Sequence, residues 1–339
     1  KELWRLFAMD KQKNAQIKVA LLLGGWSVER MVSLTKGKAV EAALIEAGFD
    51  VHVVDVRESL SKLMVELENI KPDVVFNNLY GKGGEDGTIQ AILELLNIPY
   101  THSGVQASAV AMDKPMTKAI ARGIGINVAD ELICSKAEIT TQQTIKPPFV
   151  IKPKDEGSSV GIYMIGANGT NMLPKIQADW PFEDKVMIET FIPGEELTVA
   201  VLDGKAQGVT KIISKQDFFD YQAKYVDTDT VYELPASVPK DVYARAMADA
   251  EKLYAKLGCR GIARCDFRYD DKQGVDGVYL LEINTQPGLT AESIGPSQVI
   301  YNGSSFAELC THLIEDALCY DKQKHDRPSQ SQAASQIAG

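Results

Sequence analysis

The pattern of hydrophobic and polar positions changes twice along this chain. From Lys18 to about Thr101, short apolar runs alternate with segments in which apolar residues recur every three or four positions. The first pattern predicts buried strands and the second amphipathic helices, so we expect an open α/β unit with a parallel sheet. The expected strands are 18–25, 50–56, 73–79 and 98–102, and the expected helices are 27–48, 59–70 and 87–97.

The turn between the first strand and the first helix reads GGWSVE. Ser27 is a typical helix-capping residue, and Gly48 is typical of a helix end. The turn lacks the G-x-G-x-x-G spacing of dinucleotide sites, so the interpretation of the chain as an oxidoreductase loses its main support. Glu29 has two interpretations, either a carboxylate that caps the helix or a polar group at the sheet edge where ligands bind.

After Gly104 the pattern becomes mixed, with short strands, turns and fewer helices. A helix is expected to open near Asp113, with Pro115 just inside it. The strands expected beyond it are 149–153, 161–167, 185–192, 197–204 and 205–213, followed by a polar loop at 214–236 and helices at 240–258 and 305–319. We therefore expect an irregular extension (1–16), an N-terminal α/β substrate domain (17–104), a small central α+β subdomain (105–196), a C-terminal α+β domain (197–320) and a disordered tail (321–339).

Two neighbouring segments near the C-terminus are predicted to pair as an antiparallel hairpin. Residues 261–270 and 278–288 alternate in the manner of strands, and the link at 271–277 is rich in turn residues. In such a pair Asp266 lies roughly opposite Glu282, with both side chains on one face of the sheet. Opposed carboxylates are destabilising unless a positive group lies between them.

A divalent cation is the positive group that these side chains predict. Asp266, Glu282 and Asn284 offer hard oxygen donors, which suit Mg²⁺, an ion that keeps its other positions for water and substrate phosphates. Arg264, on the same face, can neutralise charge on a phosphoryl group in transfer. The hairpin therefore predicts a site for a metal–nucleotide complex.

The segment PFVIKPKDEGSSVGIYMI predicts a strand, a Gly/Ser-rich turn and a second strand. Small residues let backbone N–H groups approach a phosphate, and the hydroxyls of Ser158 and Ser159 add donors. Lys152, at the end of the first strand, can place its ammonium on a phosphate. The Walker A pattern is absent, and an ordinary hairpin with a surface lysine explains the segment equally well.

The segment VMIETFIPGEELTVAVL has features of an adenine site and carries Glu189. Phe191 and Ile192 suit an apolar slot for the base, and Glu196 can accept hydrogen bonds from a ribose diol. A solvated hairpin is the alternative, and the segment by itself favours it.

Several loops carry further polar groups with possible ligand contacts. The glycine-rich loop 79–87 lies on the same rim as Glu29, and Gly288 and Ser293 follow the metal strand, where they can grip a substrate carboxylate. The loop 214–236 is of a kind that closes over substrates. The other loop residues considered are Lys114, Lys224 and Tyr225, each of which a solvated side chain explains as well.

Composition narrows the class of protein. The chain has 339 residues, enough for two or three domains, and its net charge of −10 argues against a nucleic acid or anionic membrane partner. The five cysteines form no C-x-x-C pair, which indicates a reducing compartment, and the start has no signal-peptide pattern, so a cytoplasmic protein is expected. The four histidines have no metal or triad spacing, and neither G-x-S-x-G nor H-E-x-x-H occurs, so a hydrolase or zinc enzyme has no support.

Six motifs occur between Val19 and Asp316: GGWSVER, GEDG, IPYTHSGVQASAVAMDK, IKPKDEGSSVG, GIARCDF and LLEINTQPGLT. Together, and in this order, they resemble the D-alanine–D-alanine ligase family of the ATP-grasp superfamily. The resemblance implies an ATP-grasp fold of three domains, with ATP held between the central and C-terminal ones. It also implies ATP and Mg²⁺ as cofactors, with Mn²⁺ as a substitute, and a homodimer.

The resemblance implies a role for most of these polar residues. Glu29, Ser158 and Tyr225 match a hydrogen-bonded triad that orients the first D-alanine and holds the loop closed. Lys224 and Arg264 match groups that neutralise phosphate charge. The implied catalytic residues are Glu29, Ser158, Tyr225, Arg264 and Ser293. The implied substrate contacts are Glu29, Tyr80, Arg264, Gly288 and Ser293, with Gly288 and Ser293 on the second D-alanine.

The remaining implied roles concern ATP and the metal ion. The implied metal ligands are Asp266, Glu282 and Asn284, in agreement with the hairpin argument. The implied nucleotide contacts are Lys114, Lys152, Ser159, Glu189, Phe191, Ile192, Glu196 and Lys224.

The implied reaction joins two D-alanines for peptidoglycan precursor and cell wall synthesis. ATP phosphorylates the carboxylate of one D-alanine, and the amine of the second attacks the acyl phosphate. A D-lactate or D-serine ligase is the nearest alternative, against which the Lys224–Tyr225 pair argues. A second alternative is a nucleotide-binding regulator that does not turn over ATP. It is disfavoured because all three proposed metal ligands and Arg264 are present.

The chain departs from the family pattern at four positions: Met31, Gln286, Leu289 and Tyr80, which stands where the family usually has His in an L-H-G motif. The change at Tyr80 matters most, because its loop lies close to the proposed first-substrate site.

Overall fold

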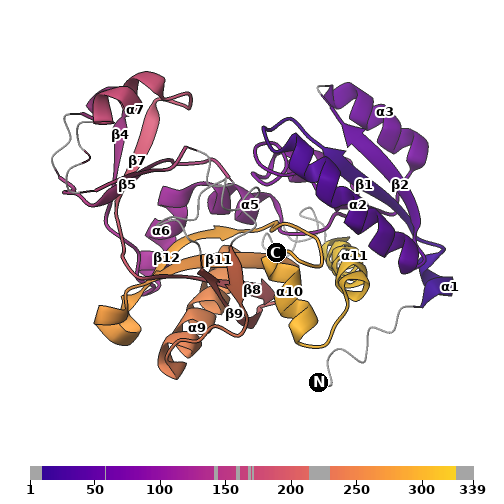
Figure 1. Cartoon of the computed structure of the whole chain (residues 1–339). Coiled ribbons are helices and arrows are strands. Elements are labelled where there is room, and N and C mark those ends of the chain that lie inside the picture. The colour runs from indigo at the N-terminus through magenta and orange to yellow at the C-terminus, as the bar shows by residue number, and fades with distance from the viewer. Residues whose placement is uncertain are drawn as a thin grey trace, which may run out of the picture.

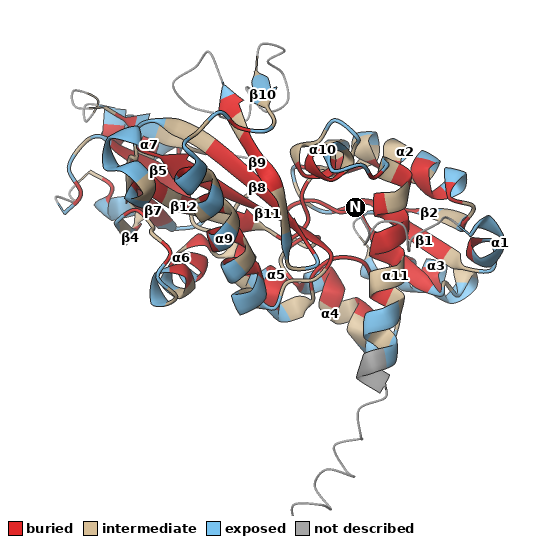
Figure 2. Ribbon diagram, turned by 90° about the horizontal axis from the view of Figure 1, so that it is seen from below, coloured by how far each residue is buried: buried red, intermediate tan, exposed pale blue. Residues whose placement is uncertain are grey.

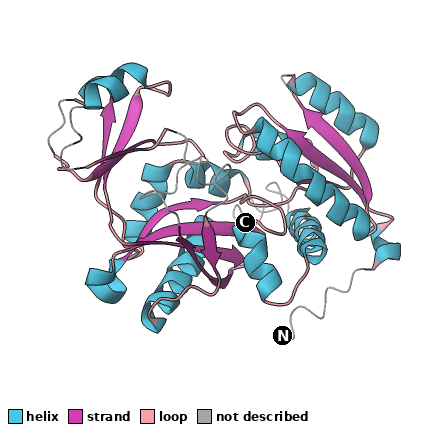
Figure 3. Cartoon of the chain, viewed as in Figure 1, coloured by secondary structure: helices cyan, strands magenta, loops and turns pink. Residues whose placement is uncertain are grey.

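The described part of the chain forms three sheets, each with its own helices, around a shared central region (Figure 1, Figure 3). The computed structural model describes residues 10–57, 59–140, 144–157, 161–166, 169, 172–213 and 230–325, with side chains to Lys322. The expected combination of one parallel α/β unit with antiparallel α+β units is confirmed. Among the described residues, none of the helices is both long and apolar enough to span a bilayer.

The first sheet is parallel, as the sequence predicts. Its middle strand pairs on both sides, which explains why every residue from Val19 to Gly24 is buried. The strands run in the order β2 (Asp50–Val56), β1 (Lys18–Gly24) and β3 (Val74–Asn77), and the helices are α1 (Lys11–Asn14), α2 (Arg30–Glu46), α3 (Leu60–Ile70) and α4 (Thr88–Leu95). Helix α1 lies within the segment that we expected to be irregular.

Two local predictions for this unit are wrong. Residues 98–102 contribute a single parallel bridge at Tyr100 rather than a strand. Helix α2 has Glu29, not Ser27, at its N-cap. The Ser27 hydroxyl accepts a hydrogen bond from the Glu29 N–H (3.1 Å) and donates one to the Tyr80 carbonyl (2.6 Å). Ser27 therefore ties the start of the helix to the glycine-rich loop.

The second sheet is antiparallel and carries Lys152 and Glu189. Glu189 lies opposite Val150, two residues before Lys152 on the neighbouring strand, so the two charged side chains are diagonal neighbours on one face. The strand order is β4 (Glu131–Ser135), β7 (Lys185–Thr190), β5 (Phe149–Pro153) and β6 (Tyr163–Ile165), with α7 (Leu173–Asp179) and the 3₁₀ helix η2 (Lys136–Glu138) beside it.

The third sheet contains the predicted hairpin, and its middle strands are buried (Figure 2). The strand order is β10 (Val231–Glu233), β9 (Lys205–Ile213), β8 (Glu195–Leu202), β11 (Ile262–Tyr269) and β12 (Val278–Asn284), and the expected link is the 3₁₀ helix η4 (Asp271–Gly277). Alternate residues of β8 and β11 pack against α9 (Lys240–Leu257), which leaves the other face for polar side chains.

Four more helices join this sheet to the first one. Helices α5 (Val105–Met112) and α6 (Lys114–Gly123) pack on β12, and α10 (Ile294–Tyr301) packs on β8 and β9. Helix α11 (Phe306–His325) packs against α2 and β3. It therefore continues five residues into the segment expected to be a disordered tail, and residues 326–339 lie outside the described part.

An ion pair fixes α11 to the turn after β8. His312 Nε2 is bonded to Asp203, and Arg260 pairs with Asp316 on the same helix at 3.1 Å. Burial disfavours the charged imidazole, but the hydrogen bond and the charge of Asp203 outweigh it and raise the pKa of His312 above 6.5.

We expect a His312→Gln variant to lose stability in a pH-dependent way. Because the folded pKa lies above the unfolded one, the contribution of His312 is fully present below pH 6.5 and is lost as pH rises through the folded value. In acid, the free energy of unfolding of the variant should be about 1 kcal/mol lower than that of the unmodified protein, and this difference should narrow above neutral pH. Urea denaturation of both proteins from pH 5.5 to 9 checks this, and a deficit independent of pH would contradict it.

Candidate active site

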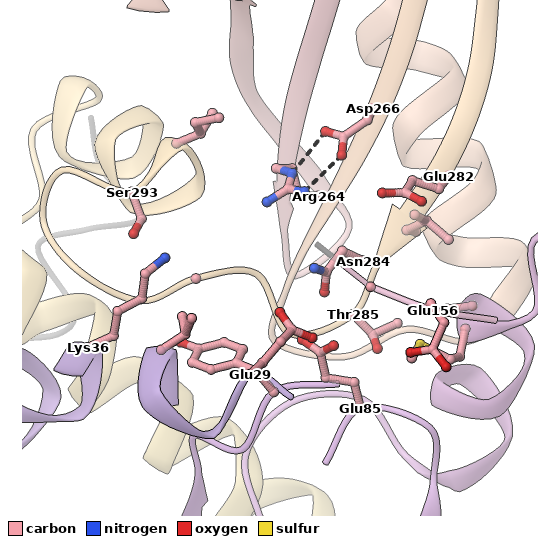
Figure 4. Close-up of a pocket in the computed structure, with 18 of the residues that line it drawn as sticks. Glu29, Lys36, Glu85, Glu156, Arg264, Asp266, Glu282, Asn284, Thr285 and Ser293 are labelled. Atoms are coloured by element: carbon pink, nitrogen blue, oxygen red, sulfur yellow. Dashed lines mark hydrogen bonds and ion pairs between the residues drawn. The ribbon is translucent and has the colours of Figure 1, made fainter. Parts of the chain in front are cut away.

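A cavity of about 380 Å³ lies between the three sheets, with walls from α2, the loop 79–87, α6 and the third sheet. Figure 4 shows polar side chains pointing into it from several of these elements. Most of the residues predicted for the site line this cavity: Glu29, Tyr80, Lys114, Glu196, Arg264, Asp266, Glu282, Asn284, Gly288 and Ser293.

The hairpin has the register that its alternation predicts. Asp266 lies opposite Glu282, and Arg264 lies opposite Asn284. The register shifts just after Asp266, where Leu281 is the extra residue on β12. This bulge lets Leu280 and Ile283 both face the core while Glu282 faces the cavity.

Cations already balance the two carboxylates of the hairpin. Arg264 donates two hydrogen bonds to Asp266, at 2.9 and 2.8 Å (Figure 4). The Thr198 hydroxyl donates a third at 2.6 Å. Lys114 Nζ lies 3.2 Å from Glu282 Oε2 and donates to the Glu156 carbonyl at 2.6 Å. Two acidic and two basic groups therefore meet on one wall, an arrangement suited to a charged phosphoryl group.

Lys152 and Glu189 are buried behind this wall instead of lining the cavity. Lys152 Nζ lies 2.8 Å from Glu189 Oε1, and Lys118, which is 0% exposed, is bonded to the other carboxylate oxygen. Burial and the nearby charge of Lys114 lower the pKa of Lys152 to about 8. One carboxylate thus holds two buried ammonium groups, an arrangement that costs stability when a partner is lost.

Of the other predicted nucleotide contacts, the three that the structure describes gather around Arg268. Its guanidinium lies over the ring of Phe191 at 5.4 Å, and its Nε donates to the Ile192 carbonyl at 3.0 Å. Its Nη1 lies 3.8 Å from Glu196 Oε2. Arg268 therefore holds the strand connection between β7 and β8 in place beside the cavity.

Two buried carboxylates face each other at the glycine-rich loop. A Cβ added to Gly157 would lie 3.0 Å from Glu29 Oε2 and 3.9 Å from Glu85 Oε2, so both carboxylates converge on one space (Figure 4). Burial and the charge of Glu29 raise the pKa of Glu85 well above its ordinary value. Such a pair suits an ammonium group of a ligand.

Four predicted residues, Ser158, Ser159, Lys224 and Tyr225, lie outside the described residues. Four residues of the site or its surroundings were not predicted from the sequence. Thr198 and Lys118 gave no sequence signal, since both contacts depend on how the sheets pack. Glu85 stands in the GEDG motif. Lys36 follows Glu29 by seven residues, two helical turns, so the helical period places both on one face.

Comparison with known proteins decides the family. The family model described as "D-ala D-ala ligase C-terminus" matches residues 120–315, and that for "D-ala D-ala ligase N-terminus" matches 58–103. The D-alanine--D-alanine ligase of Dinoroseobacter shibae is 47% identical, over 91% of this chain and 98% of the relative. The chain belongs to the D-alanine–D-alanine ligase family. The ligase of Rhodospirillum rubrum is 44% identical, over 89% of this chain and 98% of the relative.

Solved structures of the family have the same fold. D-alanine--D-alanine ligase from Bacillus anthracis has a TM-score of 0.76 at 31% identity, covering 91% of this chain and 99% of that chain. A structure of the Bacillus anthracis ligase complexed with ATP has a TM-score of 0.75 at 27% identity, with the same coverage. The ATP-grasp architecture predicted from the motifs is therefore confirmed.

Proposed function

We propose that this chain is an ATP-dependent ligase that joins two D-alanines, giving D-alanyl-D-alanine for peptidoglycan precursor synthesis with release of ADP and phosphate. The observation that carries this proposal is the division of charge within one cavity. Phosphate-handling groups lie on the hairpin wall. The carboxylates of Glu29, at the start of α2, and Glu85, on the glycine-rich loop, lie across the cavity from them, where an amino acid ammonium fits.

The chemistry proceeds in two steps that fit this division. A carboxylate is a poor electrophile, so transfer of the ATP γ-phosphoryl group to one carboxylate oxygen supplies a leaving group and releases ADP. The amine of the second D-alanine then attacks the acyl carbon, and phosphate leaves as the amine loses a proton. Arg264 and Lys114, which line the cavity, stabilise charge on the phosphoryl group, and water has to be kept from the acyl phosphate, which it would hydrolyse.

The donor set on the hairpin fits Mg²⁺. Asp266 and Glu282 lie opposite one another on β11 and β12, and Asn284 lies two residues after Glu282 on β12. All three line the cavity and offer hard oxygen atoms. Among the described residues, no group of three His, Cys, Asp or Glu side chains converges as a metal cluster. The amide of Asn284 would be the third protein donor, and Mg²⁺ would supply positive charge beside the transferred group.

The finer assignments support the same function. On the family motifs we assign nucleotide contacts to Lys114, Lys152, Ser159, Glu189, Phe191, Ile192, Glu196 and Lys224, although Lys152 and Glu189 pair with each other behind the wall and do not line the cavity. The first-substrate triad is assigned on the same motifs to Glu29, Ser158 and Tyr225. A homodimer is proposed on the same basis. A reducing, cytoplasmic location agrees with five free cysteines.

A product assay tests the proposal directly. With ATP, Mg²⁺ and D-alanine the protein should release ADP in a D-alanine-dependent way and form D-alanyl-D-alanine. The same assay with D-lactate added should still give the dipeptide as the main product at neutral pH. A depsipeptide as the main product would show that D-lactate, not D-alanine, is the preferred acceptor. ATP binding without ADP release would indicate a regulator.

A further inference from the structure

Gln286, one of the four departures from the family pattern, connects the hairpin wall to the glycine-rich loop 79–87. It lies two residues after the end of β12, and its side chain is buried. The side-chain N–H donates a hydrogen bond to the Leu79 carbonyl, and the side-chain oxygen accepts one from Asn77 Nδ2 at 2.8 Å. Asn77 ends β3 and Leu79 begins the loop, so this side chain joins the third sheet to the first.

The contacts of Gln286 belong to a buried network that shapes the loop. Asn77 Nδ2 also donates to the Gly84 carbonyl at 3.0 Å, and Gln90 Nε2 donates to the same carbonyl at 2.9 Å. Both of these side chains are fully buried, so water does not compete for the bonds. Gly84 directly precedes Glu85 in the loop. The network therefore fixes the backbone that carries the Glu85 carboxylate.

The backbone of Gln286 is bonded to the opposite wall of the cavity. Its N–H donates to Asn284 Oδ1 at 2.8 Å, which fixes the orientation of that amide. Asn284 lies opposite Arg264 in the hairpin, and it lines the same cavity as Glu85 (Figure 4). Gln286 is thus connected to the hairpin wall through its backbone and to the glycine-rich loop through its side chain.

The separation of these two walls decides whether a bound donor can react. An α-amino acid carries its ammonium and its carboxylate on one carbon atom, so its length cannot adjust to the site. With the ammonium at Glu29 and Glu85, the carboxylate must meet the transferred phosphoryl group at the hairpin wall. Glu29 is connected to the same loop through the hydrogen bonds of Ser27. Since a displacement of about 1 Å can lower a rate about 100-fold, phosphoryl transfer requires a rigid connection between the walls.

We propose that Gln286 is a positioning residue, which holds the carboxylates of Glu29 and Glu85 at the distance from the hairpin wall that the donor D-alanine requires. This assignment rests on the proposed function and deepens it, because it names the contact that aligns the donor with ATP. The side chain is buried behind the lining of the cavity. Gln286 therefore acts through the loop 79–87 and not by contact with a substrate.

Steady-state kinetics of Gln286→Ser test the assignment. Serine is too short to reach Asn77 or Leu79, and the space that it leaves can admit water to the freed polar groups, so the variant should remain folded. We expect kcat to fall roughly 10- to 100-fold, the cost of misaligned reactants. The KM for ATP should stay the same, and the donor KM for D-alanine should change less than kcat. Gln286→Met, which leaves the buried Leu79 carbonyl without this donor, should lower kcat similarly and lose more stability.

Two comparisons separate alignment from folding. Asn14→Leu removes a buried amide that donates to the Ala47 carbonyl at 2.8 Å, on α1 at the far end of the first unit (Figure 1). It should lower the midpoint of thermal unfolding and keep kcat. In an Asn77→Leu background, Gln286→Ser should lower kcat by a smaller factor than it does alone, because part of the contact is already lost.

The outcomes distinguish this assignment from the proposed function. A folded Gln286→Ser variant with unchanged kcat would overturn the assignment while ligation by the unmodified protein stands. An equal fall in kcat in Asn14→Leu, or equal factors with and without Asn77→Leu, would do the same. If one of the two Gln286 variants is unfolded, the other decides, and loss of the fold in both would show a structural role instead. Absence of ligation in the unmodified protein would overturn the proposed function and this assignment with it.

Discussion

Glu282→Gln should lose roughly 100- to 1,000-fold in turnover while its thermal midpoint changes little. The amide keeps the shape of the side chain but removes the charge that faces Lys114 and the proposed cation. The Glu282 side chain is 27% exposed, so loss of its ion pair costs little stability. D-Alanine-dependent ADP release and thermal unfolding of the same preparation measure the two quantities.

Asp276→Asn is the matched control for this prediction. Asp276 is an exposed carboxylate on η4, the link of the same hairpin, and it does not line the cavity. It should retain turnover and stability. ATP binding with and without Mg²⁺ adds a third measurement, in which Glu282→Gln should lose the gain that Mg²⁺ gives. Full turnover in Glu282→Gln would mean that the hairpin has only a structural role.

The hairpin shows what period-2 alternation can predict. Asp266, Glu282 and their neighbours could be placed on one face because side chains of a strand alternate strictly and a short link fixes the pairing. The bulge at Leu281 was not predictable, since it depends on how Leu280 and Ile283 pack against α9. It leaves the predicted face intact, because it falls after the pair Asp266–Glu282.

Contacts between sheets set the limit of the sequence argument. Lys152 and Glu189 were each considered for nucleotide binding, yet nothing in either segment indicated that they face one another across two strands. Lys118 lies on an amphipathic helix, where a lysine normally points to solvent. Its burial follows from the packing of α6 beside the second sheet. Tyr80 likewise acquires its partners Asn78 and Leu289 only in the folded chain.

The position of the cavity explains why distant motifs had to be read together. Each motif supplies only part of the lining, and the sheets bring these parts to one cavity. Glu29 on α2 and Arg264 on β11 are far apart in the chain but contribute to the same lining. Taken alone, a motif therefore fits an ordinary structural role as well as a functional one. Glu29 alone fits a helix cap, and Lys152 alone fits a surface lysine on a hairpin.

Glu189→Gln should be the most destabilising of the single changes considered. It leaves the ammonium groups of Lys118 and Lys152 facing a neutral amide with no access to water, and removal of one partner of a buried ion pair typically costs about 3–5 kcal/mol. We expect a large fall in the midpoint of thermal unfolding. Glu195→Gln, which removes the partner of Lys211 at a more exposed pair, should cost less than about 1 kcal/mol.

The pH dependence of the Glu189→Gln deficit distinguishes charge burial from poor packing. Burial lowers the pKa values of Lys118 and Lys152, that of Lys152 to about 8, and loss of the carboxylate lowers them further. Between the folded and unfolded pKa values the unfolded chain binds more protons, so the free energy of unfolding rises with pH. In the variant this rise begins at a lower pH than in the unmodified protein, so the deficit should shrink as pH rises toward about 8, the folded pKa of Lys152, and stay level above it. Lys118→Met added to Glu189→Gln should recover part of the deficit. A deficit that stays constant with pH, or a Glu189→Gln variant as stable as the unmodified protein, would show that the buried lysines do not depend on this carboxylate.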